Sequence, residues 1–579
     1  MADTLTTDAH KDVVSRLEAA MSDVENVMKM AEVPSISLGI IHEGNVIFRR
    51  SFGLRDIEKN LEANSDTSYL IGSCSKMITC TALGLLVEEG KLMWGDKIRT
   101  HLPDFNPIED PQIGENATLI DAARHSTGLA NPVVISLGPD GILSNTANDH
   151  LAMVNALPTS CTWGQRFRRC FYYSNAVFGL IPQVIEVTSN TRFADFVQQR
   201  ILEPLGLQQT LLHEASVQNN DNLAYPYAPQ SNNSWVKIKN HTTTENHSPI
   251  LGALGMRSSV NDLLSFLAAV MNRYDEERGA EPQQPLSSSA THNPLRKIVR
   301  MWDSWWNLPT DDGFPNETAY LLGWFKTILP TAALGWGSLN NYGGTQESII
   351  GRDSEPHTLY GNIGHVNGSD AAAYIFPETH TGIVALSNAS DGHNAAEAAA
   401  RILTQAVFDL KPHVDVPSQL QEAGKRRFQT RRNKVLEWES HRDVTAYTSH
   451  SEDFLGNYIG LNTSRVNIIK SDTAAAQVAV QFADETAGVC DLEPYKADPL
   501  SFLPIDNDTF LSRGMLDWDY YAVGVFEFLR DSDGQVVGFW WQWERTDWPG
   551  LWVKQKDGMS EQDTQEIISK FGRFRKTEN

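Results

Sequence analysis

Cysteine is scarce in this sequence, with five residues in 579, and no two of them form a C-x-x-C pair. This spacing gives neither a disulfide framework nor a zinc site. Long apolar runs are also missing, so no segment is predicted to cross a bilayer. The first twelve residues are polar and acidic and lack the apolar stretch of a signal peptide, from which we expect a cytoplasmic protein with reduced thiols.

Basic residues are in short supply, with 48 Lys and Arg against 72 Asp and Glu, which gives a formal net charge of −24. A protein this acidic, without a compensating basic face, is a poor candidate for binding nucleic acid. The hydrophobic fraction of 41% and the charged fraction of 21% are those of a globular protein and not of a disordered one.

Several motifs that mark large enzyme classes do not occur in the chain. There is no G-x-x-x-x-G-K-[ST] loop for nucleotide phosphates, no G-x-G-x-x-G after a strand, and no H-E-x-x-H zinc motif. The G-x-S-x-G elbow of α/β-hydrolases is missing as well. We therefore expect no cofactor and no catalytic metal.

The apolar pattern predicts one α/β domain over residues 13–410. Helices and strands from both ends of this region flank a middle with helical spacing. We therefore expect a sheet with helices on its faces and an all-helical insertion. Helices are predicted at 13–32, 73–89, 192–202, 259–272 and 393–409, and strands at 36–40, 371–376 and 382–386.

A polar helical segment and a β-rich module follow this domain. Residues 411–452 form a predicted helical linker, in which six basic side chains lie close together. We interpret it as a solvated connecting helix, and the alternative is a nuclear-localisation or anionic-partner patch. Residues 453–579 alternate in short segments, which predicts a small all-β barrel. The basic residues are Lys425, Arg426, Arg427, Arg431, Arg432 and Lys434.

One motif for nucleophilic catalysis does occur, the S-x-x-K sequence Ser73-Cys74-Ser75-Lys76 at the start of a predicted helix. A serine hydroxyl needs a neighbour that takes its proton, and a lysine one turn later lies on the same helix face. The helix N-terminus offers N–H groups to a developing oxyanion. The structural alternative makes Ser73 a helix cap and Lys76 a solvated residue of the first turn.

A second motif is Tyr173-Ser174-Asn175, which precedes an apolar helix predicted at 177–185. A loop in this position can place a phenol and an amide beside the serine. The phenol would relay protons, and the amide would hold a substrate carbonyl. The alternative is an aromatic loop that only packs.

With these two motifs, five longer stretches resemble the serine β-lactamase and penicillin-binding-protein superfamily, in its class C β-lactamase, esterase and D-aminopeptidase branch. The resemblance covers roughly residues 15–410, in the order of the family. It implies a β-lactamase/transpeptidase-like antiparallel sheet flanked by helices, with an all-helical subdomain. The stretches are Ser68–Asp96, Thr118–Leu129, Phe196–Leu212, Gly252–Phe266 and Phe376–Ser390.

The third motif of that family, K-T-G or H-x-G, departs from its pattern here. Counting back without gaps from Phe376-Pro377-Glu378 places Asn362-Ile363-Gly364 on the motif. Asn362 supplies no cation for a substrate carboxylate, which favours an esterase, amidase or acyltransferase over a β-lactamase or transpeptidase. The backbone N–H groups of His365 and Ser73 would then form the oxyanion hole. The His365 side chain would line the site or, alternatively, act as a catalytic imidazole.

The resemblance implies a serine acyl hydrolase of the esterase, amidase or peptidase type, which attacks a small-molecule or peptide acyl substrate through Ser73. Lys76 and Tyr173 would manage the proton, and Asn175 would orient the substrate. Tyr173 could be the base as a phenolate only if nearby cations lower its pKa, so the choice of base stays open. The alternatives are an acyltransferase of secondary metabolism and a non-catalytic binding protein.

The C-terminal module resembles the lipocalin-like domain that follows the catalytic domain in some peptidases of this branch, on the match of Leu455–Gly460. Related modules cover the active site or mediate oligomers, so a homo-oligomer is a further expectation. Its tryptophans could line a ligand cavity or form barrel core. Residues 275–320 are predicted to form an insertion or lid, and its tryptophans could likewise bind the acyl group or only pack. The tryptophans concerned are Trp518, Trp540, Trp541, Trp543, Trp548 and Trp552 in the module and Trp302, Trp305 and Trp306 in the lid.

Overall fold

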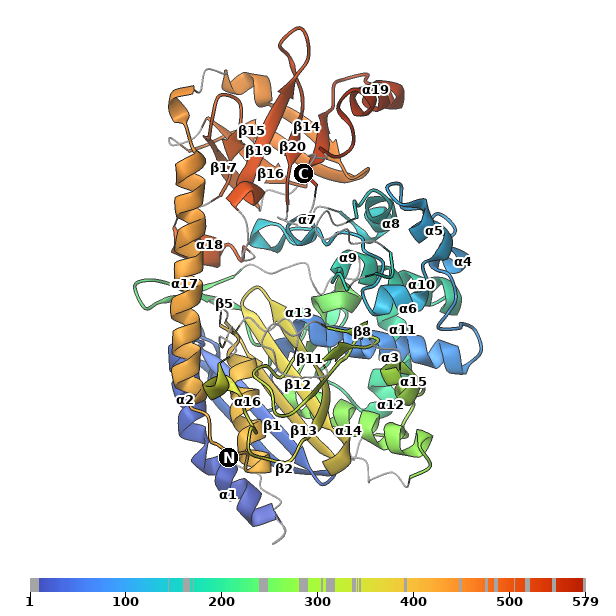
Figure 1. Cartoon of the computed structure of the whole chain (residues 1–579), viewed down its shortest axis with the longest axis vertical. Helices are drawn as coiled ribbons and strands as arrows, with labels where there is room; N and C mark the ends of the chain where they lie inside the picture. The colour runs from blue at the N-terminus through green and yellow to red at the C-terminus, as the bar shows by residue number, and fades with distance from the viewer. Residues whose placement is uncertain are drawn as a thin grey trace.

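The computed structural model shows three parts in chain order: an α/β region, the long helix α17 (Val416–His441), and a β-barrel (Figure 1). The structure describes residues 10–143, 145–159, 167–169, 171–238, 248–280, 290–303, 306–308, 318–335, 340, 342, 345–389, 393–446, 450–473, 477–483, 488–503, 506–515, 521–543 and 548–575.

A nine-stranded antiparallel sheet, in the order β3-β2-β1-β13-β12-β11-β10-β9-β8, carries the α/β region. Its centre joins the two ends of that region, because β1 pairs with β13, with Leu38 opposite Ala385. This confirms the sheet that was expected from strands at both ends. The strands are β1 (Ser35–His42), β2 (Asn45–Asp56), β3 (Leu61–Glu62), β8 (Trp306–Asn307), β9 (Ala319–Tyr320), β10 (Phe325–Ile328), β11 (Thr358–Val366), β12 (Ser369–Phe376) and β13 (Thr381–Ser387).

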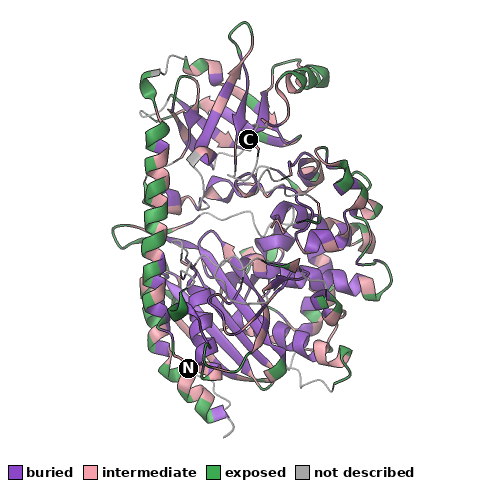
Figure 2. Cartoon of the chain, viewed as in Figure 1, coloured by how far each residue is buried: buried purple, intermediate pink, exposed green. Residues whose placement is uncertain are grey.

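Helices cover both faces of the sheet, and its central strands are buried along their length (Figure 2). On β13, Ile383 and Ala385 pack with α1 (Lys11–Ala19), α2 (Met21–Met30) and α16 (Ala395–Phe408). The alternate residues Val384 and Leu386 pack with α3 (Ser75–Glu88) and α14 (Val260–Glu277). A strand buried on both sides reads as a continuous apolar run, which is the pattern of 382–386.

The helix predicted over 13–32 is two helices, since the chain turns at Ala20 between α1 and α2. The break lets Leu17 of the first helix and Val24 of the second both reach the buried interface under the sheet. The apolar period continues through the turn, so the pattern alone did not reveal the break.

A mostly helical subdomain fills the middle of the α/β region, as expected. The helices are α4 (Ile98–His101), α5 (Pro111–Asn116), α6 (Leu119–Ala123), α7 (Val133–Ser136), α8 (Ala147–Asn155), α9 (Asn175–Phe178), α10 (Leu180–Ser189), α11 (Phe193–Val197), α12 (Glu203–Leu205), α13 (Glu214–Gln218) and α15 (Ile298–Asp303). Short strands pair as β4 (Tyr69–Leu70) with β7 (Arg257–Ser258) and β5 (Tyr227–Pro229) with β6 (Trp235–Lys237).

The predicted lid over 275–320 lies only partly within the described residues. Trp302, on α15, is 4% exposed and stacks on Tyr360 with ring centroids 4.2 Å apart. Trp306 belongs to β8 at the edge of the sheet, and Trp305 lies outside the described residues. For Trp302 the structure therefore supports packing and not a lid.

Eight strands at the C-terminal end close into the expected barrel. Its interior is filled by aromatic rings: Trp541 and Trp552 are 1% and 0% exposed, Trp552 stacks on Phe539, and Trp541 packs on Trp552. These positions support the core interpretation of the tryptophans, while Trp518 lies outside the described residues. The elements are β14 (Gly456–Gly460), β15 (Ser464–Lys470), β16 (Val478–Phe482), β17 (Val489–Pro494), β18 (Leu500–Ser501), α18 (Asn507–Ser512), β19 (Val525–Arg530), β20 (Val536–Trp541), β21 (Gly550–Lys554) and α19 (Glu561–Phe571).

The helix α17 runs along one side of the molecule and connects the two domains (Figure 1). Leu420 near its start packs with the core under the sheet, and Trp438 near its end packs on Tyr495 of the barrel segment. Between these anchors the helix is largely exposed (Figure 2). In the described part of the chain, no helix combines the length and the apolarity that a membrane crossing requires.

Candidate active site

Ser73 lies in a single 3-10 turn, Gly72–Cys74, immediately before α3, two residues ahead of the start of the α-helix. The turn packs tightly against β11. Gly72 has φ +49°, and a Cβ built on it would lie 2.5 Å from the backbone nitrogen of His365. On the strand side, a Cβ on Gly364 would lie 1.9 Å from the carbonyl oxygen of Ile71. Two glycines thus allow the backbones of Ser73 and His365 to approach each other.

Lys76 is 0% exposed and reaches back along α3 towards Ser73. Its Nζ lies 3.2 Å from Ser73 Oγ and 2.7 Å from both Asn175 Oδ1 and the carbonyl oxygen of Ala253. Burial lowers the pKa of the Lys76 amine well below its ordinary value. The alternative in which Lys76 is a solvated residue of the first turn is therefore wrong.

Lys76 Nζ contacts three oxygen atoms, and burial favours its neutral form. In the two short bonds, Nζ donates to Asn175 and to Ala253. Its third contact is with Ser73 Oγ, to which Nζ donates. Residues from three separate segments thus hold the amine beside the serine hydroxyl.

Tyr173 completes the contacts around the serine, because its hydroxyl lies 2.8 Å from Ser73 Oγ. Its ring also lies beside the lysine, with Nζ of Lys76 4.8 Å from the ring centroid. Burial raises the pKa of the Tyr173 phenol above its ordinary value, so the hydroxyl keeps its proton at neutral pH. The loop is therefore more than an aromatic packing segment.

Asn175 is the first residue of α9, and the Ser174 side chain caps that helix. Its backbone N–H donates to Asn131 Oδ1 at 2.9 Å, and its side chain is 9% exposed. Because Asn175 Oδ1 accepts a bond from Lys76, the Nδ2 group is the part of the amide that a substrate carbonyl could use.

The third-motif residues lie on β11, and Asn362 is turned into the protein. Asn362 is 4% exposed, and its Nδ2 donates to the carbonyl oxygen of Gly323 at 2.9 Å. His365 Nδ1 lies 2.7 Å from Asp370 Oδ1, directly across the strand pair. The imidazole leaves the sheet on the same face as Ile363, two residues earlier. Of His365, it is the backbone nitrogen that lies next to the Gly72 turn.

Cys74 immediately follows Ser73 but does not compete as a nucleophile. The side chain is buried, and its Sγ donates to the carbonyl oxygen of Asn362. Burial raises the pKa of the Cys74 thiol to about 12, and a buried thiol without a nearby stabilised cation is unreactive.

The structure also brings two residues to the site that the sequence did not single out. Tyr320 on β9 and His125 after α6 are both 1% exposed, and their polar atoms lie 3.3 Å apart beside Tyr173. His125 lies in the stretch Thr118–Leu129, one of those that resemble the family, so the resemblance could have pointed to it. Nothing in the local pattern around Tyr320 indicated a place at the site.

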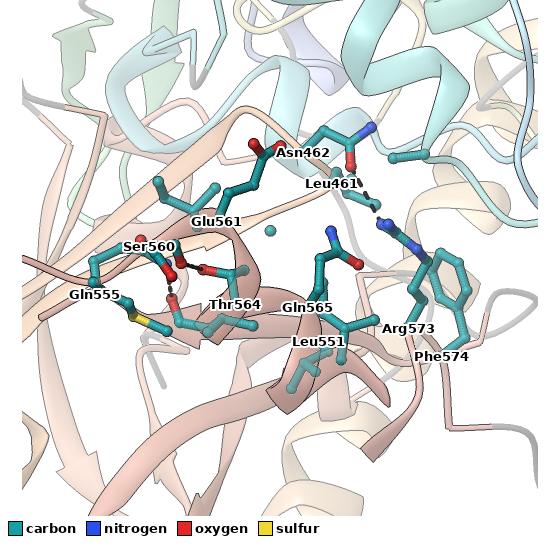
Figure 3. Close-up of a pocket in the computed structure, with 16 residues that line it drawn as sticks. Leu461, Asn462, Leu551, Gln555, Ser560, Glu561, Thr564, Gln565, Arg573 and Phe574 are labelled. Carbon is teal, nitrogen blue, oxygen red and sulfur yellow. Dashed lines mark hydrogen bonds between the residues drawn. The ribbon is translucent and has the colours of Figure 1, made fainter. Parts of the chain in front are cut away.

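A cavity of about 540 Å³ lies elsewhere, between α19 and the barrel wall (Figure 3). Arg573 donates to Asn462 at its rim, and Ser560 is occupied as the N-terminal cap of α19. None of the predicted site residues lines it. Among the described residues, no cluster of three or more His, Cys, Asp or Glu side chains could hold a metal ion.

Comparison of the sequence with protein-family models matches this chain to one family. A protein-family model described as Beta-lactamase matches residues 22–407, more than half of the chain. Protein flp from Staphylococcus aureus (strain COL) is 22% identical over 321 residues, 55% of this chain and 58% of that protein. Unguisins hydrolase ungD' from Aspergillus campestris (strain IBT 28561) is 23% identical over 337 residues, 56% of this chain and 58% of that protein. The chain thus spans less than two thirds of the length of these relatives.

Among solved structures, the octameric penicillin-binding protein homologue from Pyrococcus abyssi superposes with a TM-score of 0.53 at 18% sequence identity. The match covers 93% of this chain and 98% of that one, so it includes the barrel as well as the α/β region. At this identity the likeness shows the shared fold, and it confirms the expected fold class.

Proposed function

The chain belongs to the beta-lactamase family, and from that premise we propose that it is a serine acyl hydrolase in which Ser73 forms an acyl-enzyme. Family membership supports a serine hydrolase. The observation that carries the proposal is the convergence on one oxygen, because Lys76 Nζ and Tyr173 Oη lie 3.2 and 2.8 Å from Ser73 Oγ. A nucleophile with a base in hydrogen-bond reach is the signature of this chemistry.

In the first step, Ser73 Oγ attacks the acyl carbonyl carbon while its proton passes to the lone pair of Lys76. The carbonyl oxygen becomes an oxyanion, which the backbone N–H groups of Ser73 and His365 stabilise. Burial favours the neutral form of Lys76, and in that form the amine accepts the proton without first having to lose one to solvent.

In the second step, the bond from the carbonyl carbon to the leaving group breaks. Tyr173 gives its hydroxyl proton to the leaving atom, and the Lys76 ammonium returns a proton to Tyr173. Water then attacks the acyl-enzyme by the reverse route, loses its proton to the same pair and releases the acid and Ser73.

The uncharged third motif favours acyl substrates that do not depend on a carboxylate contact there. Asn362 stands where the family carries a lysine or histidine, and its amide is already bonded to Gly323. The relative ungD' is named a hydrolase, which supports transfer to water. We therefore favour a small-molecule or peptide ester or amide as the substrate.

The test is covalent labelling of the whole chain with a fluorophosphonate, followed by intact-mass measurement and peptide mapping. We expect one adduct, on Ser73, which Ser73→Ala abolishes and Ser75→Ala, two residues away, retains. An unlabelled wild-type chain would refute the proposal. If added alcohols diverted the acyl group from free acid to ester, transfer to an acceptor would replace hydrolysis as the function.

We also propose that the chain forms a homo-oligomer. The solved neighbour, which matches nearly the whole chain with its barrel, is octameric by its title. Light scattering on the full chain after size exclusion should give a mass at least twice the 64.5 kDa of one chain. A single species of 64.5 kDa at micromolar concentration would contradict the expectation.

A further inference from the structure

His125 contacts three consecutive residues of the segment that carries Tyr173. Its carbonyl oxygen accepts from the backbone N–H of Tyr172 at 2.9 Å, and its Nδ1 accepts from that of Ser174 at 3.1 Å. Between these two bonds, the imidazole lies against the Tyr173 ring, with centroids 4.1 Å apart and 33° between the planes. His125 therefore fixes the backbone on both sides of Tyr173 and packs against its phenol ring.

The bond from Ser174 also sets the hydrogen position on the ring. Because Nδ1 accepts, a neutral His125 carries its hydrogen on Nε2. Burial lowers the pKa of His125 well below its ordinary value, which keeps the ring neutral. The Nε2–H group lies 3.3 Å from the Tyr320 hydroxyl and therefore donates to it.

The Tyr320 hydroxyl is in turn bonded to Tyr173, and its ring meets that of Tyr173 edge-on at 6.0 Å. With its own oxygen accepting from His125, Tyr320 donates its hydrogen to the Tyr173 oxygen. The Tyr173 hydroxyl lies 2.8 Å from Ser73 Oγ, to which Lys76 Nζ donates at 3.2 Å. The bonds from His125 to Tyr320 and from Tyr320 to Tyr173 run in the same direction, and a hydroxyl that accepts a bond donates a stronger one.

We propose that Tyr320 and His125 are positioning residues that hold the Tyr173 hydroxyl and polarise it for proton donation to the leaving group. This rests on the proposed function. When the acyl bond breaks, the Tyr173 proton goes to the leaving atom and Lys76 replaces it, while Tyr320 and His125 keep their protons. They act through Tyr173 and do not touch the reacting atoms.

The test compares two acetate esters that differ in how much their leaving group needs a proton. In Tyr320→Phe, which keeps the ring and removes the hydroxyl, we expect acylation by phenyl acetate to slow about tenfold. Acylation by 4-nitrophenyl acetate, whose phenolate leaves readily, should slow by less than about threefold. Fluorophosphonate titration counts the competent sites, so that rates are compared per active enzyme.

The matched control is Tyr360→Phe, on a partly buried ring that stacks on Trp302 outside this series. This variant should keep the wild-type ratio of the two rates. His125→Asn offers an acceptor near the Nδ1 position without a donor to Tyr320, so it should reproduce the leaving-group dependence of Tyr320→Phe. Equal slowing of both esters, or no slowing, would overturn the proposal. A wild-type chain that takes no label on Ser73 would defeat the proposed function instead.

Discussion

At the scale of single residues, burial decides which group at the site can be the base. Lys76 and Tyr173 are both withdrawn from water, and burial disfavours the charged form of each. The pKa of Lys76 falls and that of Tyr173 rises, so burial favours the neutral form of both groups. A neutral amine accepts a proton readily and a neutral phenol does not, which favours Lys76 as the base and Tyr173 as the proton carrier.

The pH dependence of labelling tests this assignment. The rate of fluorophosphonate labelling should rise with pH as Lys76 loses its proton, and level off above its pKa. The midpoint should lie well below the ordinary lysine value of about 10.4. Tyr173→Phe should lower the plateau but keep the midpoint, whereas loss of the pH dependence in that variant would identify the phenol as the base. Labelling rates of both proteins, measured over the pH range in which they stay folded, decide whether Lys76 or Tyr173 is the base.

Substitution of the lysine itself gives a second prediction. Lys76→Arg should slow labelling by at least about 100-fold, because a guanidinium stays protonated and cannot accept the serine proton. Lys91→Arg, at an exposed position beyond the same helix, serves as the control and should label at the wild-type rate. Labelling of Lys76→Arg within tenfold of wild type would show that another group takes the proton.

At the scale of elements, the site depends on how closely one turn approaches one strand. The Gly72–Cys74 turn and β11 pack with backbone against backbone, and a side chain on Gly364 would collide with the carbonyl of Ile71. The family resemblance, with gapless counting from Phe376-Pro377-Glu378, placed the glycine of the third motif at Gly364, where the approach occurs. The sequence did not predict the 3-10 turn, because its hydrogen bonds depend on what packs against it.

Gly364→Ala tests this approach. The added methyl group would lie 1.9 Å from a backbone oxygen, so we expect a loss of about 1–3 kcal/mol in unfolding free energy and loss of labelling at Ser73. Gly95→Ala, which meets no atom within 4 Å, should change neither. Thermal unfolding and labelling of the two variants provide the comparison, and a fully active Gly364→Ala would show that the turn and strand can separate without cost.

At the scale of the whole molecule, the barrel touches the turn that follows the third motif. Asn367, between β11 and β12, donates to the carbonyl oxygen of Gly514 after α18. The neighbouring Arg513 pairs with Asp140 of the helical subdomain at 2.8 Å, and its carbonyl accepts from the Asp140 backbone N–H at 2.7 Å. The barrel is therefore joined both to the sheet domain and to the helical subdomain beside the site.

Removal of the Arg513 side chain tests whether this junction supports the site. Arg513→Ala leaves the largely buried Asp140 without its cation, so we expect about 1–3 kcal/mol lower stability and slower labelling at Ser73. The control is Arg575→Ala, which breaks a pair with Glu527 inside the barrel. If both variants label at the wild-type rate, the barrel contact has no part in positioning β11.

The sequence by itself determined the elements and the class of chemistry. Apolar periodicity reflects which face of an element is buried, so the central strands β1, β12 and β13, the helix after Ser73 and the barrel followed from it. The pair Ser73 and Lys76 followed as well, because helical pitch alone places residues three apart on one face.

Only the tertiary structure decided the burial that lowers the pKa of Lys76 and the residues that surround the pair. Tyr173 is 100 residues from Ser73, and Tyr320 is 195 residues from His125, distances over which no local pattern specifies a contact. The pKa of Lys76 depends on the water that the packed chain excludes, and this exclusion is a property of the assembled core and not of any one segment.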